Sequence, residues 1–262
     1  MLKPWHDPDQ SILVVGSSPT YGDGHGPNYL HPLLNPYKRP PADTVWCYQV
    51  GEAVNNISQG GIGNQDKTDL IVSHITDSVK EVWCQYTWYS RKRVWIDDDY
   101  YAKVGCKAWQ EESGGTPHTF PVANDLLESK LSLGKLNSYK FHSLMDKWYV
   151  TQQNDYAGLY TDMREILFAQ EFLRARNVKF YWMLSYNFDP NNVKQYCRLP
   201  YHEHALQAIV GKIEWSNCFT IQGLSWDVWM RENIEQTPDG HFGPEAHKIW
   251  ANEFKKWRDA KG

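Results

Sequence analysis

Apolar residues recur along the chain in short runs that predict strands alternating with helices. Ser11 to Val15 is a nearly continuous apolar run that ends at Gly16, which is typical of a buried parallel strand. Further strands are predicted within 55–64 and at 82–88, 178–186 and 218–221. Because helical patterns separate these runs, we expect a mainly parallel sheet covered by helices on both faces, in an α/β architecture.

The helices are predicted where apolar residues recur at a spacing of three to four positions. The first helix is expected from Asp43 or Thr44 to about 54, and the second ends at about 79. The others are expected over 143–177, over 204–213, and from Pro244 to the end of the chain. Asp43 or Thr44 is a candidate cap for the first helix, and Pro244 occupies the first helical position that proline prefers. Ligands of such folds bind beyond the carboxyl ends of the strands, so we look there for chemistry.

One stretch, from about 91 to 141, does not follow this alternation of strand and helix patterns. It contains the Asp97-Asp98-Asp99 run and a Ser-Gly-Gly-Thr-Pro segment, and it shows little periodicity. We interpret it as an insertion that forms a lid or a substrate loop. The 262 residues therefore predict a single α/β domain that spans 1–262 and carries this insertion.

Composition narrows the classes of partner. The formal net charge is -4, which gives no reason to expect nucleic-acid binding. The 13 Trp and 16 Tyr are many for a polar chain. Such rings line a carbohydrate groove or a protein interface, or they fill a half-polar core, and the sequence leaves these alternatives open.

The cysteines and the N-terminus bear on the compartment. Five Cys stand at wide spacings with no Cys-x-x-Cys pair, so we expect free thiols and neither a zinc site nor a disulfide framework. The first residues lack the apolar stretch of a signal peptide, which predicts cytoplasmic synthesis. No apolar run approaches the roughly 20 residues that cross a membrane, so no membrane association is expected.

The candidate chemistry is divided between the two ends of the chain. Ser18 follows the first predicted strand on a tight turn, while Asp239 and His241 lie on a loop just before the last helix. A serine hydroxyl is a weak nucleophile until a base takes its proton, and a histidine titrates near neutral pH. Ser18, His241 and Asp239 are therefore predicted to be nucleophile, base and orienting acid.

The ordered segments resemble the SGNH (GDSL-type) hydrolases, and most closely their bacteriophage and bacterial SGNH-like esterases. Gly16-Ser17-Ser18-Pro19-Thr20-Tyr21-Gly22 matches the family's Gly-Asp-Ser block, with Ser17 in place of the Asp, and Asn56-Ile57-Ser58-Gln59-Gly60-Gly61 matches its second block. The resemblance implies a three-layer α/β/α, flavodoxin-like fold. It makes Ser18 the nucleophile, and it assigns backbone N–H groups of Ser18 and Gly61 to an oxyanion hole.

Two further blocks depart from the family pattern. The third normally ends a strand with an Asn that gives the third oxyanion donor, whereas this chain has 85–91 without Asn, so Thr87 or Arg91 takes that place. In the last block, His241 onward aligns well, but Asp239 precedes the His by two residues rather than three. His247 falls on the apolar face of the last helix and is interpreted as a packed structural residue.

The expected activity is that of a serine esterase that needs no cofactor and no metal. It would hydrolyse an O-acyl group, such as an O-acetyl group, on a small molecule or a polysaccharide. The alternative is a catalytically weak or inactive protein of the same fold that binds glycan. A virion component with protein partners in the particle is an example. A glycoside hydrolase is a third reading, which would require paired carboxylates about 5–9 Å apart.

Three other motifs are weaker candidates for a catalytic or metal-binding site. Asp23 and His25 stand in a loop that mimics the terminal motif and compete as an acid/base pair. The run 201–204 contains two His and one Glu, which are metal-ligand types, but no further ligand stands at tight spacing. Asp97-Asp98-Asp99 reads as a solvated acidic turn more readily than as a calcium site.

Overall fold

A parallel four-stranded sheet forms the centre of the protein. The computed structural model describes residues 9–22, 44–51, 53–58, 62–87, 92–97, 100–106, 119–122, 155–237 and 241–262. The strands of the central sheet are β1 (Ile12–Val15), β2 (Val54–Asn56), β3 (Glu81–Tyr86) and β7 (Lys179–Leu184). They pair in the order β2-β1-β3-β7, with all three pairings parallel.

The prediction of a strand at 218–221 is wrong, because this segment forms only isolated bridges. Cys218 forms an isolated parallel bridge with Trp182 on the free side of β7, and Ile221 turns back to pair with Leu224. This bridge occupies the fifth position of a flavodoxin-like order, in which the ligand crevice opens between β1 and β3. The carboxyl ends of β1, β3 and β7, here called the carboxyl edge, therefore carry the candidate site.

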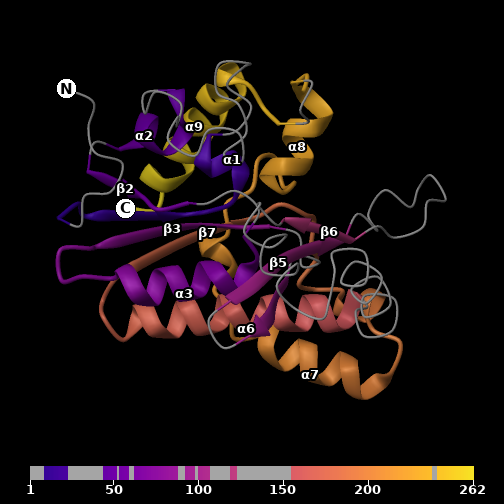
Figure 1. Cartoon of the computed structure of the whole chain (residues 1–262). Coiled ribbons are helices and arrows are strands. Elements are labelled where there is room, and N and C mark those ends of the chain that lie inside the picture. Colours follow the sequence, from indigo (N-terminus) through magenta and orange to yellow (C-terminus); the bar gives the residue numbers. More distant parts are fainter. Residues whose placement is uncertain are drawn as a thin grey trace.

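Helices cover both faces of the sheet and give the three-layer α/β/α fold that was expected (Figure 1). One layer contains α1 (Ser18–Tyr21), α2 (Trp46–Val50), α8 (Trp226–Asn233) and α9 (Pro244–Asp259). The other contains α3 (Asn64–His74), α6 (Asp155–Arg174) and α7 (Pro200–Val210). Short 3-10 turns, η3 (Val193–Tyr196) and η4 (Trp215–Asn217), follow β7 and α7.

The alternation of side chains along each strand divides the core into two clusters. In β1, Leu13 and Val15 pack toward α3 and α6, whereas Ile12 and Val14 pack toward α2 and α9. Strands buried on both faces read as continuous apolar runs, which is why β1 was visible in the sequence. The buried area on each side fixes the register of the sheet, since a slip by one residue would exchange the two faces.

Several of the tryptophans are core residues. Trp46 stacks on Trp250 with ring centroids 4.4 Å apart, and Trp250 stacks on Trp226 at 4.0 Å. Trp83 of β3 adjoins Trp46 at 5.8 Å. These four indoles are buried between the sheet and α9. The packed-core interpretation therefore holds for them.

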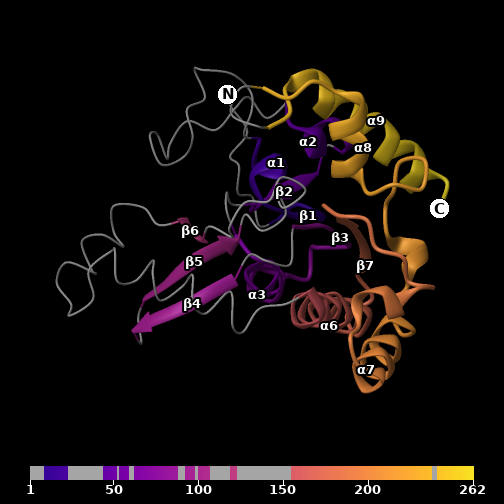
Figure 2. The same cartoon turned by 90° about the vertical axis from the view of Figure 1, so that its right-hand side faces the viewer.

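The segment 91–141, which was interpreted as an insertion, contributes a separate antiparallel sheet. β4 (Lys92–Asp97) pairs with β5 (Tyr100–Cys106), which pairs with β6 (Thr119–Val122). This sheet lies on the α3 side of the molecule (Figure 2). The sequence did not predict these strands. The lid or substrate role of 91–141 remains a prediction.

Element boundaries differ from the predictions where capping was used to place them. α2 begins at Trp46, and Val45 occupies its N-cap without a side-chain hydrogen bond, so the expected cap by Asp43 or Thr44 is wrong. α3 ends at His74, five residues before the predicted end. α8 was not predicted, although Ser225 caps it by accepting a hydrogen bond from the Val228 N–H at 3.4 Å.

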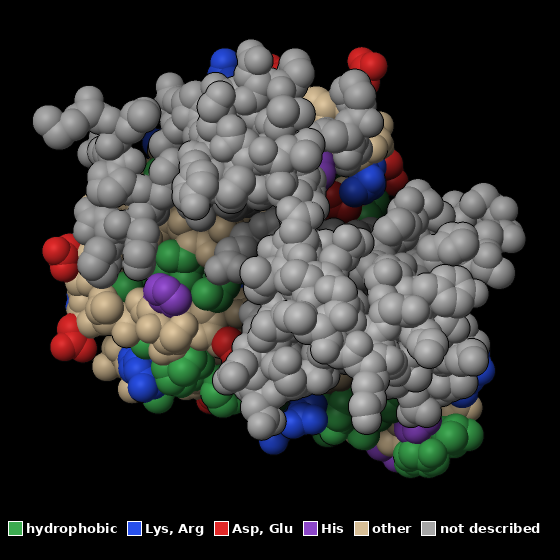
Figure 3. Space-filling model, viewed as in Figure 1, with side chains coloured by type: hydrophobic (Ala, Val, Ile, Leu, Met, Phe, Trp, Pro, Cys, Tyr) green, Lys and Arg blue, Asp and Glu red, His purple; other side chains and the backbone are tan. Residues whose placement is uncertain are grey.

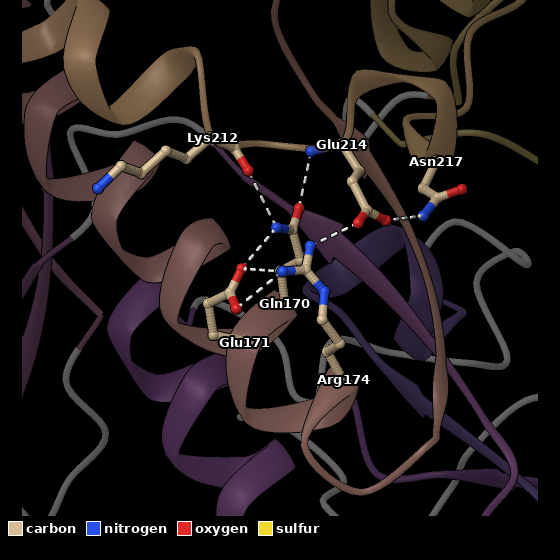
Figure 4. A network of polar contacts seen from close by, with 6 residues as sticks. All are labelled: Gln170, Glu171, Arg174, Lys212, Glu214 and Asn217. Atoms are coloured by element: carbon tan, nitrogen blue, oxygen red, sulfur yellow. Dashed lines mark hydrogen bonds and ion pairs between the residues drawn. The ribbon is translucent and has the colours of Figure 1, made fainter.

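At the amino edge of the sheet, a buried amide ties α6 to the loop after α7 (Figure 4). Gln170 Nε2 donates to the Lys212 carbonyl at 3.1 Å, and its Oε1 accepts from the Glu214 N–H at 2.7 Å. Arg174 forms ion pairs with Glu171 and Glu214 beside it. The charged pairs are about half exposed and contribute little, so the amide is the main tether.

The described surface is chemically mixed. Lys and Arg side chains alternate with Asp and Glu over the described part of the face in Figure 3. Among the described residues, no helix is both long and apolar enough to cross a membrane. Cys47, Cys84, Cys197 and Cys218 are free thiols.

Candidate functional site

The predicted site residues that the structure describes lie at the start of α1, directly after β3 and in the loop before α9. Ser18 is the first residue of α1, three positions after β1 ends, and Thr87 directly follows β3. His241 lies three residues before α9. Asp239, Gly61 and Arg91 lie outside the described residues, as do Asp23 and His25.

A buried amide holds the turn that carries Ser18. Gln85 Oε1 accepts hydrogen bonds from the Ser17 N–H at 3.2 Å, from the Ser17 hydroxyl at 3.4 Å and from the Thr20 hydroxyl at 2.7 Å. Gln85 is 1% exposed, so these bonds are shielded from water. Ser18 therefore sits between two residues that are bound to the same atom of β3.

The other end of this amide is also fixed. Gln85 Nε2 donates to Ser185 Oγ at 3.2 Å, and the Ser185 hydroxyl donates to the Tyr86 carbonyl at 3.1 Å. Ser185 directly follows β7, so one chain of hydrogen bonds runs from β7 through β3 to the turn after β1. Because its two ends have different partners, the orientation of the Gln85 amide is determined.

Gly16 allows this close approach. A Cβ at this position would lie 2.5 Å from Thr20 Cβ and 2.9 Å from Gln85 Oε1, both shorter than real contacts. The turn after β1 therefore requires glycine for space rather than for an unusual backbone angle.

Asn56 links the same turn to the loop after β2. Its Nδ2 donates to the Thr20 carbonyl at 2.8 Å, and its Oδ1 accepts from the Ser58 N–H at 3.0 Å. Asn56 belongs to the segment that was predicted to lead to Gly61. The described start of this segment is therefore anchored to α1.

A second buried amide fixes the backbone of Thr87. Asn64 Oδ1 accepts from the Thr87 N–H at 2.8 Å, and Asn64 Nδ2 donates to the Thr87 carbonyl at 2.9 Å. The Thr87 N–H is therefore already engaged, whereas its hydroxyl makes no hydrogen bond to the described residues. An oxyanion donor at Thr87 would have to be this hydroxyl.

Asn64 is in turn held by α6. Its Nδ2 also donates to Asp162 Oδ2 at 2.6 Å, and the Tyr186 hydroxyl donates to the same oxygen at 3.0 Å. Lys67 Nζ donates to Asn64 Oδ1 at 3.1 Å from a side chain with no exposed surface. Buried charges persist only when they are paired or hydrogen-bonded, and this network meets that condition.

The loop that carries His241 is fixed by its backbone. The His241 carbonyl accepts from the Thr237 N–H and from the Thr237 hydroxyl, each at 2.9 Å. Phe242 pairs with Gln236 and is buried, with its ring 6.2 Å from that of Trp226. The side chain after His241 is therefore anchored in the core.

His247 is a packed structural residue, as was expected. It is 1% exposed, and its Nδ1 accepts from the Trp46 N–H at 3.2 Å. The Trp46 indole N–H donates to the Thr20 hydroxyl at 3.4 Å. Trp46 thus connects the start of α9 to the turn that carries Ser18, which brings the two ends of the chain to one side of the sheet.

Neither Cys84 nor Tyr86 is an activated group beneath the site. Burial raises the pKa of the Cys84 thiol to about 12, despite the opposing charge of Lys67. Burial also raises the pKa of Tyr86 well above its usual range. Both side chains are therefore protonated at neutral pH and serve as packing residues.

The weaker metal motif is not assembled. In the described ranges, no three His, Cys, Asp or Glu side chains are grouped to hold a metal ion. His202 instead stacks on Tyr156 with ring centroids 3.9 Å apart. The strand β4 ends at Asp97, and Asp98 and Asp99 lie outside the described residues.

Sequence reasoning missed Gln85 and Asn64, which fix the backbone on either side of the candidate crevice. Gln85 had a detectable signal, since it is a polar residue in the apolar run 82–88. A polar side chain buried at a strand end is retained where it has partners. Asn64 had no such signal, because it begins a helix of ordinary composition.

No protein-family model and no curated protein matches the chain. Among solved structures it is similar to TesA, with 11% identity, 95% of this chain and 97% of the other covered, and a TM-score of 0.42. It is also similar to the psychrotrophic esterase EstA from Pseudoalteromonas sp. (10% identity, 95% and 98% covered, TM-score 0.41). A third is the acetyl-xylooligosaccharide esterase Axe2 from Geobacillus Stearmophilus (12% identity, 95% and 93% covered, TM-score 0.39). Because every TM-score is below 0.5, neither fold nor function is inferred from these likenesses.

Proposed function

We propose that the protein is a serine esterase of the SGNH type with Ser18 as its nucleophile. The observation that carries the proposal is the turn after β1, which Gln85 fixes on both sides of Ser18. This turn lies between β1 and β3, where folds of this strand order bind their ligands. Gln85 thereby positions the backbone on both sides of the proposed nucleophile.

The proposed reaction passes through an acyl-enzyme. Ser18 Oγ attacks the ester carbonyl carbon while His241 accepts the hydroxyl proton. The tetrahedral intermediate collapses, the alcohol leaves with the proton from His241, and the acyl group remains on Ser18. Water then attacks the acyl-enzyme with His241 again as base, which releases the carboxylic acid and restores the serine. Asp239 holds the imidazole in the required tautomer.

Three donors are proposed for the oxyanion, namely the N–H groups of Ser18 and Gly61 and the hydroxyl of Thr87. The assignment to the Thr87 hydroxyl follows from the hydrogen bond between the Thr87 N–H and Asn64 Oδ1. Of the two candidates for the third donor, Thr87 is preferred to Arg91, because β3 delivers it directly to the carboxyl edge. Preorganised donors of this kind contribute about 10²–10³ in kcat each.

For the substrate we propose an O-acyl ester whose alcohol is a carbohydrate, with an O-acetyl group as the simplest case. Acetyl requires no long acyl pocket, and a sugar alcohol suits a protein rich in Trp and Tyr. Not all of these rings are in the core, since Trp215 and Tyr196 are half-buried beyond β7.

The test is covalent labelling with a fluorophosphonate probe, followed by peptide mass spectrometry. We expect label on Ser18, and its loss in His241→Ala with the thermal unfolding temperature retained. Label on another serine, or none on folded protein, would contradict an activated Ser18.

A non-catalytic glycan-binding or structural role on the same fold, for example in a virion, is the second candidate. Ser17 replaces the family's Asp, and β3 ends at Tyr86 and is followed by Thr87, without the Asn of the third block. Under this candidate the protein binds glycan but takes no fluorophosphonate label and hydrolyses no acetyl ester. The same experiment therefore separates the two candidates.

A further inference from the structure

A cavity of about 600 Å³ opens beyond the carboxyl end of β7. Its floor includes Leu184 and Tyr186, and its sides come from η3, from Trp215 and from the loop before α8. Its volume falls within the range of small-molecule sites. His241 is not among the described residues that line it.

Three aromatic rings form one wall of this cavity. Phe188 stacks on Tyr196 with centroids 5.1 Å apart and planes 17° apart, and on Trp215 at 5.3 Å and 18°. All three rings are only half-buried. Rings stacked in this way present to a ligand their apolar edges and the faces that no other ring covers.

Neutral polar side chains add hydrogen-bonding groups to the same cavity. Asn192, Gln195 and Thr220 line the cavity, are exposed, and make no side-chain hydrogen bond to the described residues. By contrast, Asn187 is used structurally, since its Oδ1 accepts from the Ser225 N–H at 2.9 Å. The cavity therefore combines an apolar wall with amide and hydroxyl groups that are available to a ligand.

The charge of the cavity disfavours an anionic ligand. Among the described residues that line it, Asp189 has the one charged side chain, and its Oδ1 already accepts from the Asn191 N–H at 2.9 Å. Sites for phosphate or carboxylate groups commonly use Arg, Lys or an α-helix N-terminus. The described lining has neither Arg nor Lys, and Ser225, the N-cap of α8, is the one α-helix N-terminus that it includes. A negatively charged ligand would meet a carboxylate without a compensating cation.

We propose that this cavity binds the sugar units of a neutral oligosaccharide. A pyranose ring presents an apolar C–H face, which suits the Phe188–Tyr196–Trp215 wall. It also presents hydroxyl groups that donate and accept, which suit Asn192, Gln195 and Thr220. Both requirements are met on one cavity without a charged partner.

The cavity adjoins, on two sides, residues that contact the candidate catalytic loops. Tyr186 in its floor follows Ser185, which is hydrogen-bonded to the Gln85 that fixes the Ser18 turn. Ser225 in its wall precedes Trp226, which packs on Phe242, the residue after His241. The proposal rests on the esterase function only for its role as a glycan subsite of that reaction, because sugar binding itself requires no hydrolysis.

The test measures binding of sugars that carry no hydrolysable O-acyl ester. Saturation-transfer difference NMR and calorimetry on the full chain would use cellotetraose, xylotetraose and tetra-N-acetylchitotetraose, with tetragalacturonate as the acidic comparison. We expect at least one neutral sugar to bind with a dissociation constant at or below about 1 mM. Binding should persist in Ser18→Ala, so failure of the esterase proposal would not affect this result.

Four variants locate the binding. Phe188→Leu removes a ring but keeps apolar volume, and Gln195→Ala removes a free amide; each should weaken binding about 3- to 10-fold. Their matched controls are Phe168→Leu, at a ring that is 53% exposed on α6, and Gln207→Ala, at an exposed amide on α7. The controls should leave binding unchanged.

Three results would overturn the proposal. They are no binding by any neutral sugar at about 10 mM, tighter binding of tetragalacturonate than of every neutral sugar, and equal affinities in the cavity variants and the wild type. Thermal unfolding of each variant ensures that a loss of binding is not a loss of folding.

Discussion

Gln85→Met tests the idea that a buried amide positions the nucleophile. Methionine keeps a similar length and volume but can neither accept from the Ser17 N–H and the Thr20 hydroxyl nor donate to Ser185. Ser185 retains its bond to the Tyr86 carbonyl. Three donors on the Ser18 turn lose their acceptor, and the two shorter of these bonds come from the Ser17 N–H and the Thr20 hydroxyl.

The expected loss of folding stability in Gln85→Met is worked from the Ser17 N–H and the Thr20 hydroxyl. Ser17 and Thr20 are 1% and 0% exposed, so water does not replace the lost acceptor. A buried donor left without a partner costs about 1–3 kcal/mol, which gives about 2–6 kcal/mol for the pair. At roughly 2–4 °C per kcal/mol for a chain of this length, the unfolding temperature falls by about 4–24 °C.

Activity should fall further than stability alone explains. A misplacement of about 1 Å at a reacting atom costs about 100-fold in rate, so we expect kcat to fall by at least tenfold with a smaller change in KM. The assay is hydrolysis of p-nitrophenyl acetate well below the unfolding temperature of the variant. A fluorophosphonate labelling rate that falls in parallel would locate the defect at Ser18.

Gln170→Met is the matched control. Gln170 is 3% exposed and also holds both ends of its amide, on the Lys212 carbonyl and the Glu214 N–H, but at the amino edge of the sheet. It should lose comparable stability and retain kcat. The reasoning is refuted if Gln85→Met keeps full kcat, or if Gln170→Met loses as much of it.

Three further predictions concern Thr87, Gly16 and Cys84. Thr87→Val should lower kcat about 10²–10³-fold with little change in KM, and Thr87→Ser should retain most activity; an active Thr87→Val would exclude the hydroxyl as a donor. Gly16→Ala should cost about 1–3 kcal/mol by urea unfolding, because its Cβ would meet Thr20 at 2.5 Å, whereas Gly211→Ala, whose Cβ would meet the Gln207 carbonyl oxygen at 3.2 Å, should cost less. Burial raises the pKa of Cys84 from 9.0 to about 12, so the folded protein keeps a proton that the unfolded chain releases between these values. The free energy of unfolding should therefore be unaffected by this group below pH 9 and fall by about 1.4 kcal/mol per pH unit above it, and a decline that is equally steep in Cys84→Ala would contradict this cause.

The sequence by itself determined the elements whose patterns are local. The apolar run of β1, the alternating helices and strands, and the proline that starts α9 were each predicted and found. These features depend on side-chain periodicity and on backbone preferences that every residue carries with it. The three-layer architecture follows from them, because a sheet with two apolar faces requires cover on both.

Local pattern did not reveal α8 or the antiparallel strands β4 to β6. α8 is eight residues long and amphipathic, and it follows a turn in which Gly223 has a φ of 83°. Its burial depends on Trp226 meeting Trp250, a contact between residues of different helices. Short elements have weak periodicity, so long-range packing decides whether they form.

For the candidate site, the sequence determined which residue types are present and in what order, whereas the tertiary structure decided what holds them. Ser18 and His241, with Thr87 or Arg91 as a further donor, were predicted from motifs alone. The hydrogen bonds of Gln85 to the Ser18 turn and of Asn64 to Thr87 join residues at least 23 positions apart. A buried amide binds whichever backbone the folded chain brings within about 3 Å of it, and only the parallel pairing of β1 with β3 and the packing of α3 decide which backbone that is.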